Sequence, residues 1–211
     1  MERKYVIGLD YGTLSGRAII ADCKDGTVLA SAVKEYDLPD GTEPTGTGWA
    51  LQNPKDYIDV LKYIIPEAVA QSGVSSKDII GIGLDFTSCT MLPVDENNVP
   101  LCLLVKNVSR PHAWVKLWKH HGAQKQADEI NELLKKRGEI DNIQFGGKIS
   151  SELLLPKILQ IVEEDPELYD EAASFLEVGD WLTQILTNGR KRSGNLAGYK
   201  AMWTPETGYP S

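Results

Sequence analysis

A short polar turn between two apolar segments near the start of the chain most limits what this chain can fold into. Residues 9–17 read Leu-Asp-Tyr-Gly-Thr-Leu-Ser-Gly-Arg, with apolar runs on both sides. This pattern predicts two antiparallel strands joined by a tight turn. A third apolar segment, Val28–Val33, follows a Lys-Asp-Gly turn signal at residues 24–26. Residues 5–34 are therefore predicted to form a three-stranded antiparallel meander.

The first turn combines an acid, a glycine and a hydroxyl, which suits it to an anion such as the tail of ATP. Gly12 would let the backbone come close to a phosphate, because it has no Cβ and tolerates positive φ. The Thr13 hydroxyl and backbone amides could donate to phosphate oxygens. Asp10 could hold a hydrated Mg²⁺ that neutralises them. The same residues also fit an ordinary hairpin, in which Arg17 simply pairs with Asp10.

The composition excludes some classes of partner. A net charge of −8 and a pI near 5.0 leave no dominant basic surface, which argues against a nucleic-acid partner. No apolar run reaches roughly 18 residues, so no membrane span is predicted. Three scattered cysteines, Cys23, Cys89 and Cys102, suit reduced thiols rather than a disulfide framework or a zinc site. Since no leader is visible, the chain is predicted to be cytoplasmic.

The middle of the chain predicts a helix followed by a buried strand. Asn53 and Pro54 signal a helix start, and Pro66 is expected to kink or split that helix. Residues 79–85 are almost continuously apolar, which predicts a strand buried on both faces at the centre of an α/β sheet. The polar segment 85–90 follows, at the end of the strand where open α/β sheets bind ligands.

The remaining segments predict short strands and helices. Residues 37–50, rich in glycine and proline, are expected to form a connecting loop, because no lysine follows the glycines. The expected elements are a hairpin of residues 91–94 and 99–103, a helix at 113–136 broken near Gly122, a helix at 150–163, a strand at 174–178, and a short helix capped by Asp180 and closed by Asn188-Gly189.

Taken together, these patterns resemble a known fold. A three-strand meander with Asp-x-Gly-Thr in its first turn, followed by alternating helix and strand, resembles the ribonuclease-H-like α/β fold of the sugar kinase/actin superfamily, a mixed sheet with flanking helices. Residues 8–13 with Arg17 look like the first phosphate motif of the FGGY carbohydrate kinases. Segments 83–90, 116–121 and 198–203 narrow the resemblance to family members that act on L-ribulose, and it covers essentially all 211 residues.

The resemblance implies ATP-dependent phosphorylation of L-ribulose on its terminal hydroxyl in L-arabinose breakdown, with Mg²⁺. It assigns Ser88, Trp118 and Lys200 to the sugar, and Asp10, Gly12, Thr13 and Arg17 to the nucleotide phosphates. Lys200 is also a candidate for a catalytic role, as a point charge suited to a carbonyl or phosphoryl oxygen. Without the resemblance, Trp118 would be a core residue of an amphipathic helix, Ser88 a turn residue, and Lys200 a solvated cation.

Two other features favour structural roles over chemistry. Adjacent His120 and His121 cannot share one helical face, so they make a poor metal pair and are expected to be solvated or at the edge of the core. Asp180 is expected to be a helix cap rather than a catalytic acid. Asp85, at a strand end, does not lie in the motif that the family uses for its base.

The family's second domain holds the adenosine pocket, a further phosphate loop and the catalytic aspartate, which is expected beyond Ser211. Residues 1–211 are therefore predicted to be an incomplete N-terminal kinase domain, inactive alone. The surface such a domain would cover predicts partial disorder after about residue 140, or a homodimer. The alternatives are another pentulose or polyol kinase of the family, or a non-catalytic sugar- or nucleotide-sensing module on the same fold.

Overall fold

The protein was analysed as a computed structural model, which describes residues 3–37, 48–139 and 147–209. The chain divides into two compact units. Unit 1 comprises Met1–Asp40 and Asn53–Thr87, and unit 2 comprises Gly41–Gln52 and Ser88–Ser211. Most of the loop predicted at residues 37–50 lies outside the described residues.

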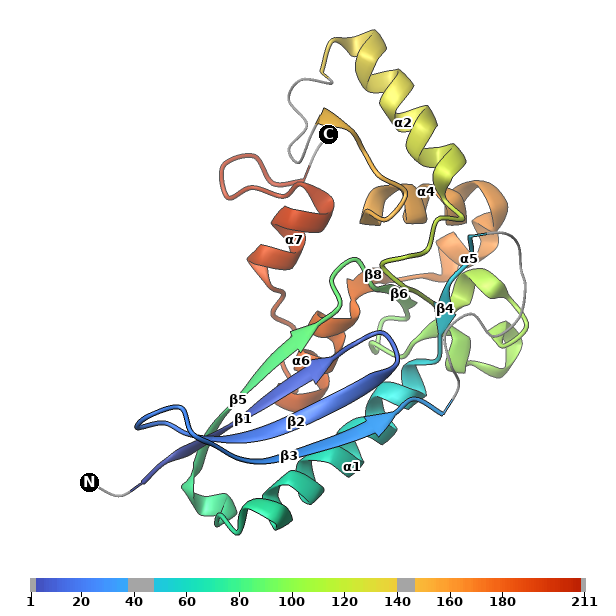
Figure 1. Ribbon diagram of the computed structural model, residues 1–211. Coiled ribbons are helices and arrows are strands. Elements are labelled where there is room, and N and C mark those ends of the chain that lie inside the picture. The colour runs from blue at the N-terminus through green and yellow to red at the C-terminus, as the bar shows by residue number, and fades with distance from the viewer. Residues whose placement is uncertain (1–2, 38–47, 140–146, 210–211) are drawn as a thin grey trace. The chain divides into compact units, whose positions relative to one another are not determined.

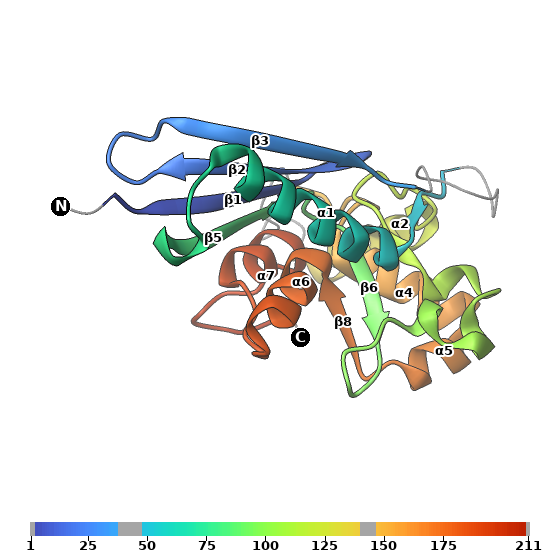
Figure 2. The ribbon, with the colours of Figure 1, turned by 90° about the horizontal axis from the view of Figure 1, so that it is seen from below.

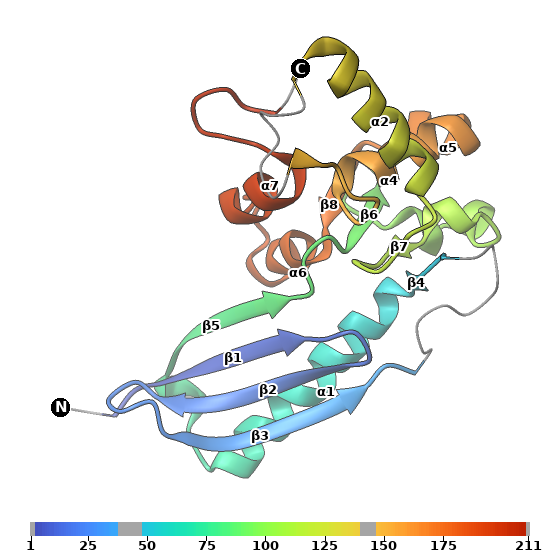
Figure 3. The same cartoon turned by 45° about the horizontal axis from the view of Figure 1, so that its top comes forward.

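The meander predicted at the start of the chain is confirmed and forms most of the sheet of unit 1. The strands are β1 (Tyr5–Tyr11), β2 (Ser15–Asp22), β3 (Val28–Glu35) and β5 (Ile79–Phe86). Their order is β3–β2–β1–β5, as Figures 1 and 3 show, with β1 to β3 antiparallel and β5 parallel to β1. Because successive side chains of a strand point to opposite faces, Leu9 and Tyr11 are buried whereas Asp10 is exposed.

One face of this sheet packs against α1 (Pro54–Ser72), which contacts β2 and β3 (Figure 3). The helix begins as predicted: Asn53 accepts a hydrogen bond from the amide of Lys55, and Gly73 ends the helix in the left-handed conformation. The predicted split at Pro66 is wrong, because the helix continues through it. Its buried residues are Pro54, Asp56, Tyr57, Val60, Ile64 and Ala68. Packing of this face compensates for the backbone hydrogen bond that a proline removes.

Strand β5 differs from its prediction as a central strand buried on both faces. It lies at one edge of the sheet, and among the described strands of unit 1 it pairs only with β1. Ile80 and Ile82 are 63% and 49% exposed. An apolar run therefore does not by itself place a strand at the centre, because burial also depends on what pairs with its outer edge.

Unit 2 contains a second, smaller sheet with the order β4–β7–β6–β8. Its strands are β4 (Leu51–Gln52), β7 (Val115–Lys116), β6 (Met91–Val94) and β8 (Ser174–Glu177), all antiparallel to their neighbours. Figure 2 shows β6 beside β8. The strand predicted at 174–178 is thus confirmed, and it pairs with β6 over a long sequence separation.

The hairpin predicted at residues 91–103 forms only in part. β6 is followed by the expected turn, but Pro100 makes only an isolated bridge with Val94, and Leu101–Leu103 form a 3₁₀ helix. Instead of forming a second strand, this segment packs Leu101 and Cys102 into the core of unit 2. That core cluster consists of Met91, Leu101, Cys102, Ala113, Ile161 and Leu168.

The predicted helix at 113–136 is wrong in its first half. Residues Pro111–Ala113 form a 3₁₀ helix and Val115–Lys116 form β7, because pairing with β4 and β6 replaces the local helical pattern. The predicted break near Gly122 is confirmed, and α2 follows it. The helices of unit 2 are α2 (Gln124–Arg137), α4 (Leu154–Glu164), α5 (Pro166–Glu171), α6 (Val178–Thr187) and α7 (Gly194–Ala201).

Three further predictions concern the last third of the chain. Asp180 is not the cap of α6, because the helix begins at Val178; its carboxylate instead accepts a hydrogen bond from the amide of Ser193 at 2.8 Å. The helix end at Asn188, in the left-handed conformation, is confirmed. Residues 147–209 contain β8 and the helices α4 to α7, and the partial disorder or dimer expected after about residue 140 stays a prediction. No helix of the described residues is long and apolar enough to cross a bilayer.

Candidate functional site

The turn between β1 and β2 is a tight hairpin end that is open to solvent. The amide of Gly12 donates to the carbonyl of Ser15 at 2.9 Å, and the Tyr36 hydroxyl donates to the carbonyl of Gly12 at 2.9 Å. Leu14 is 57% exposed and Thr13 is half-buried. The turn is therefore accessible to an anion, but the Gly12 amide is used inside the hairpin and is not a donor for phosphate.

Gly12 does not have the backbone conformation expected of it. Its φ is not positive, and a Cβ added there would meet the carbonyl oxygen of Ser15 at 3.4 Å, an ordinary contact. The prediction that this position uses the freedom of glycine at positive φ is wrong. What glycine supplies here is a turn surface without a side chain.

An aromatic cluster fixes the end of β1 from the side of α1. The rings of Tyr11, Tyr36, Tyr57 and Phe86 contact one another with centroids 5.2 to 6.1 Å apart. The Tyr11 hydroxyl donates to the carbonyl of Tyr57 at 3.1 Å. Burial raises the pKa of Tyr11 and of Tyr36, so both hydroxyls stay protonated as donors. The cluster therefore anchors the hairpin turn and the end of β5 to one helix.

The opposite face of the same strands carries a row of charges. Asp10 lies directly opposite Arg17 on β2 and directly opposite Asp85 on β5. All three side chains are exposed and line a shallow depression together with Gly8, Leu9, Ile19, Gly83 and Leu84. Carboxylates placed opposite each other repel, which a cation between them would relieve. The structure thus brings Asp10 and Arg17 together as predicted, and adds Asp85.

On the sugar side, Ser88 lies in a turn immediately after the residues of unit 1. Its neighbour Cys89 is buried and has a φ of 64°, in the left-handed region that residues other than glycine rarely adopt. Such strain persists only where surrounding contacts impose it, and it often marks functional sites. The turn is held on its far side by the amide of Val178, which donates to the Thr90 carbonyl at 2.8 Å.

Trp118 lies in a turn after β7 and is 38% exposed. The interpretation of this residue as a core side chain on an amphipathic helix is therefore wrong. The turn is closed by a hydrogen bond from the amide of His120 to the carbonyl of Leu117 at 3.0 Å. An accessible indole presents both an apolar face and an N–H donor, which suits a sugar.

The segments that carry Ser88 and Trp118 meet at one buried amine. The Lys157 Nζ donates to the carbonyl of Cys89 and to the carbonyl of Leu117, each at 2.6 Å. Lys200 lies in α7, which packs against the helix of Lys157; the Lys200 side chain is outside what the structure describes. The three predicted sugar residues therefore belong to segments that are packed around α4.

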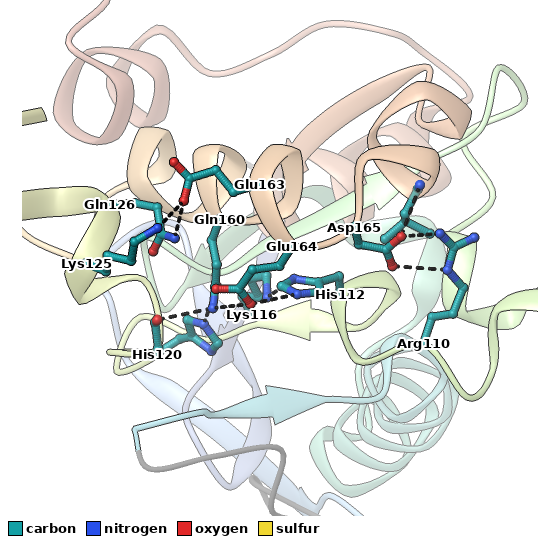
Figure 4. Close-up of polar contacts among 12 residues, drawn as sticks. Arg110, His112, Lys116, His120, Lys125, Gln126, Gln160, Glu163, Glu164 and Asp165 are labelled. Atoms are coloured by element: carbon teal, nitrogen blue, oxygen red, sulfur yellow. Dashed lines mark hydrogen bonds and ion pairs between the residues drawn. The ribbon is translucent and has the colours of Figure 1, made fainter. Parts of the chain in front are cut away.

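A polar network that the sequence did not reveal lies next to these turns (Figure 4). Lys116 is fully buried; its Nζ is 3.2 Å from His112 Nδ1 and 4.3 Å from the ring centroid of Trp49. His112 Nε2 lies 3.1 Å from a carboxylate oxygen of Glu164. Burial, and secondarily the charge of Lys157, lowers the pKa of Lys116 to about 7. Burial, followed by the charge of Lys116, lowers the pKa of His112 to about 4.

His120 belongs to the same network and is fully buried, not at the edge of the core as predicted. Its Nδ1 accepts from the amide of Ala50 at 3.3 Å, and its Nε2 lies 3.0 Å from Gln160 Oε1. Since an amide oxygen only accepts, Nε2 carries the proton and the ring is neutral. Burial, followed by the charge of Lys116, holds the pKa of His120 far below its usual range.

His121 points to other partners and has a side chain that is 52% exposed, as expected for a solvated histidine. Its ring nitrogens face Ser151 and Glu152. Across residues 3–37, 48–139 and 147–209, no three His, Cys, Asp or Glu side chains gather as metal ligands.

One sequence signal could have revealed the buried amines. Lys157 lies three residues after Leu154 and four before Ile161, so it lies on the apolar face of α4. Lys116 likewise stands between Val115 and Leu117, which are both buried. A lysine at an apolar position usually means that its ammonium has internal partners.

Comparison with known proteins identifies the family to which this chain belongs. Residues 5–194 match the family model described as the FGGY family of carbohydrate kinases, N-terminal domain. The chain belongs to this family. It is 49% identical over 205 residues to a ribulokinase of Bacillus licheniformis, covering 94% of this chain and 37% of that protein. It is 48% identical over 218 aligned positions to a ribulokinase of Halalkalibacterium halodurans, covering 100% of this chain and 39% of that protein.

Solved structures confirm the predicted fold. The chain matches a gluconate kinase from Lactobacillus acidophilus with a TM-score of 0.73 and 19% identity, over 98% of this chain and 38% of that one. It matches a ligand-bound xylulose kinase from the same organism with a TM-score of 0.74 and 19% identity, over 99% and 38%. The chain thus has the α/β fold of the sugar kinases and spans less than two-fifths of the length of the relatives it matches.

Proposed function

We propose that this chain forms the sugar-binding and phosphate-binding part of an ATP-dependent kinase that phosphorylates L-ribulose on its terminal hydroxyl, within L-arabinose breakdown in the cytoplasm. The observation that carries the choice of sugar is the 48% identity to a ribulokinase over 100% of this chain. The accessible Trp118 turn and the charged face of the sheet in unit 1 agree with it.

On the phosphate side, the proposed roles follow from charge. Asp10 and Asp85 face each other across β1 and β5 with both side chains exposed, so an oxygen-binding cation fits between or beside them. Mg²⁺ bound there would neutralise charge on the phosphates of ATP. Arg17, opposite Asp10, would hold a phosphate oxygen, and Thr13 would lie at the exposed turn. Gly12 would keep that turn free of a side chain.

On the sugar side, Trp118 would cover an apolar face of the sugar and Ser88 would hydrogen-bond a hydroxyl. Lys200, in α7, would meet the carbonyl oxygen of a ketose or the transferred phosphoryl group. An open-chain ketopentose differs from its epimers only in the direction of its hydroxyls. Discrimination among pentuloses therefore depends on side chains such as Ser88, which would accept or donate a hydrogen bond at a fixed position.

We further propose that the 211 residues alone do not turn over sugar. They match an N-terminal domain and cover 37% to 39% of the relatives' length. Phosphoryl transfer requires a group that positions the nucleophile as well as charge neutralisation. Neither Asp10 nor Asp85 lies in the motif expected for that base, so an adenosine pocket and a catalytic aspartate would come from further sequence.

The test is a binding and turnover comparison with L-ribulose, D-ribulose, xylulose and ribitol. Calorimetry on the 211-residue chain should show the tightest binding for L-ribulose, and this chain should show no turnover. A coupled ADP assay on a protein that also carries the second domain, called the intact protein below, should show the highest turnover with L-ribulose. Preference for another sugar would reassign the substrate within the family. Sugar binding without turnover by the intact protein would favour a sensing module instead.

A further inference from the structure

Lys157 is a charged residue in an apolar place. It lies near the start of α4, with its side chain fully buried, on the helix face that also carries Leu154 and Ile161. Burial of an ammonium is unfavourable unless polar groups surround it. The ammonium of Lys157 therefore requires polar partners inside unit 2, and the identity of those partners indicates its role.

Those partners are two backbone carbonyls far apart in the sequence. The Nζ donates to the carbonyl of Cys89, 68 positions away, and to that of Leu117, 40 positions away, both at 2.6 Å. A lysine ammonium is a compact charge with three donors, so one amine can bind both carbonyls at once. Charge-assisted hydrogen bonds of this kind are shorter and stronger than neutral ones. Lys157 thus adds a side-chain link between two turns whose strands, β6 and β7, pair only at Met91 and Lys116.

Each carbonyl belongs to a residue next to a proposed sugar contact. Cys89 follows Ser88, and Leu117 precedes Trp118. Cys89 also has the strained φ of 64°, and the bond from Lys157 to its carbonyl is one of the contacts that hold that conformation. The Leu117 carbonyl accepts a second bond, from the His120 amide, which closes the Trp118 turn. The same amine therefore constrains the backbone of both segments that carry the proposed sugar contacts.

We propose that Lys157 is a positioning residue for the sugar, which fixes the Ser88 turn and the Trp118 turn relative to each other so that one ligand meets both. This inference rests on the proposed function, because Ser88 and Trp118 are sugar contacts only there. Lys157 itself does not touch the sugar. A sugar is held by several weak hydrogen bonds at fixed places, so loss of this alignment weakens binding more than it slows the transfer step.

The test compares Lys157→Met with Lys157→Arg and with the control Lys125→Met, all in the intact protein. Methionine keeps the apolar stem and removes the ammonium, whereas Lys125 is exposed on α2, where it pairs with Glu163. We expect Lys157→Met to raise the KM for the sugar at least about tenfold with a much smaller change in kcat. Lys157→Arg, which keeps the charge but has a larger head, should raise KM severalfold, and Lys125→Met should not change it.

A second readout is hydrogen exchange without sugar. Amides at residues 89–91 and 117–120 should exchange at least about tenfold faster in Lys157→Met, whereas those of β1 and β2 should be unchanged. If Lys157→Met does not fold, the KM for the sugar and the hydrogen exchange are both measured on Lys157→Arg. A KM within about twofold of the wild type, or unchanged exchange at both turns, in a folded Lys157 variant would overturn the proposal. Failure of the wild-type protein to bind any pentulose would instead overturn the proposed function.

Discussion

The two units hold their candidate functional groups in opposite ways. In unit 1 the charged groups Asp10 and Arg17 are exposed on a sheet, and a buried aromatic cluster supports them from the other face. In unit 2 the exposed group is aromatic, Trp118, whereas the charged side chains of Lys116 and Lys157 are fully buried. Exposed charge costs little to remove, whereas buried charge cannot be removed without leaving its partners unsatisfied.

This difference predicts that the two halves respond differently to substitution and to pH. In unit 1, stability should reside in apolar packing and function in surface charge. In unit 2, stability and function should be coupled through the polar network. The following predictions test this contrast, from the largest expected effect to the smallest.

The largest effect is expected from Tyr57→Ala in the aromatic cluster. Tyr57 is fully buried and contacts three other rings, so truncation should lower the free energy of unfolding by about 3–5 kcal/mol. Urea denaturation measures this change. Tyr63→Ala on the same helix, where the side chain is 49% exposed, should change stability by no more than about 0.5 kcal/mol. Equal losses in the two variants would show that the cluster does not support the sheet.

Asp10→Asn should affect activity rather than stability. Removing one of two facing carboxylates relieves repulsion with Asp85, so unfolding should be unchanged or slightly less favourable. If the proposed function holds, turnover by a protein that also carries the second domain should fall by about a hundredfold, because the carboxylate proposed to hold Mg²⁺ against the phosphates is lost. Steady-state kinetics measure this change. The control is Asp25→Asn, which alters an exposed acid in the β2–β3 turn. A reduction of less than about threefold would place the phosphates elsewhere.

Mild acid should destabilise unit 2 through its buried histidines. The pKa of His112 is lowered from its ordinary 6.5 to about 4, so between these values the unfolded chain binds a proton that the folded chain does not. Stability therefore rises with pH across this window and is lost as pH falls from 6.5 to 4. His120, with its pKa lowered further, acts in the same direction.

The expected loss is at least about 1 kcal/mol between pH 6.5 and pH 4. Thermal unfolding followed across this range measures it. His112→Gln should reduce the pH dependence, and His121→Gln, which alters an exposed ring, should leave it unchanged. Identical pH dependence in all three proteins would mean that other groups, such as paired carboxylates, control acid stability.

Trp118→Ala should have the smallest effect on stability. The ring is 38% exposed and lies in a turn, so the free energy of unfolding should change by no more than about 0.5–1 kcal/mol. Fluorescence of this residue should respond to sugar, because its environment changes when a ligand covers it. A stability loss as large as that of Tyr57→Ala would mean that Trp118 is a core residue after all.

Local sequence patterns predicted the elements that local physics determines. The meander, the start of α1 at Asn53 and the end of α6 at Asn188 follow from alternation, capping and turn residues, and the structure confirms them. Patterns failed where distant segments decide the outcome. Val115–Lys116 forms a strand because β4 and β6 are available to pair with it, and Pro66 is tolerated because the face of α1 is packed.

The candidate site shows the same division. Asp10, Arg17 and the turn could be found from sequence because they lie close together along one hairpin. The role of Lys157 could not, because it depends on carbonyls 40 and 68 positions away. The resemblance assigned Trp118 to the sugar, but the local helical pattern did not indicate its exposure, because a turn replaces the expected helix.

Titration of L-ribulose into the wild type, Asp10→Asn and Trp118→Ala by calorimetry tests the central claim most directly. We predict that Asp10→Asn binds the sugar within about twofold of the wild type, because its charge serves the phosphates, and that Trp118→Ala binds at least about tenfold more weakly. Unchanged affinity in Trp118→Ala, or an equal loss in both variants, would contradict the assignment of the sugar to unit 2 and of the phosphates to unit 1.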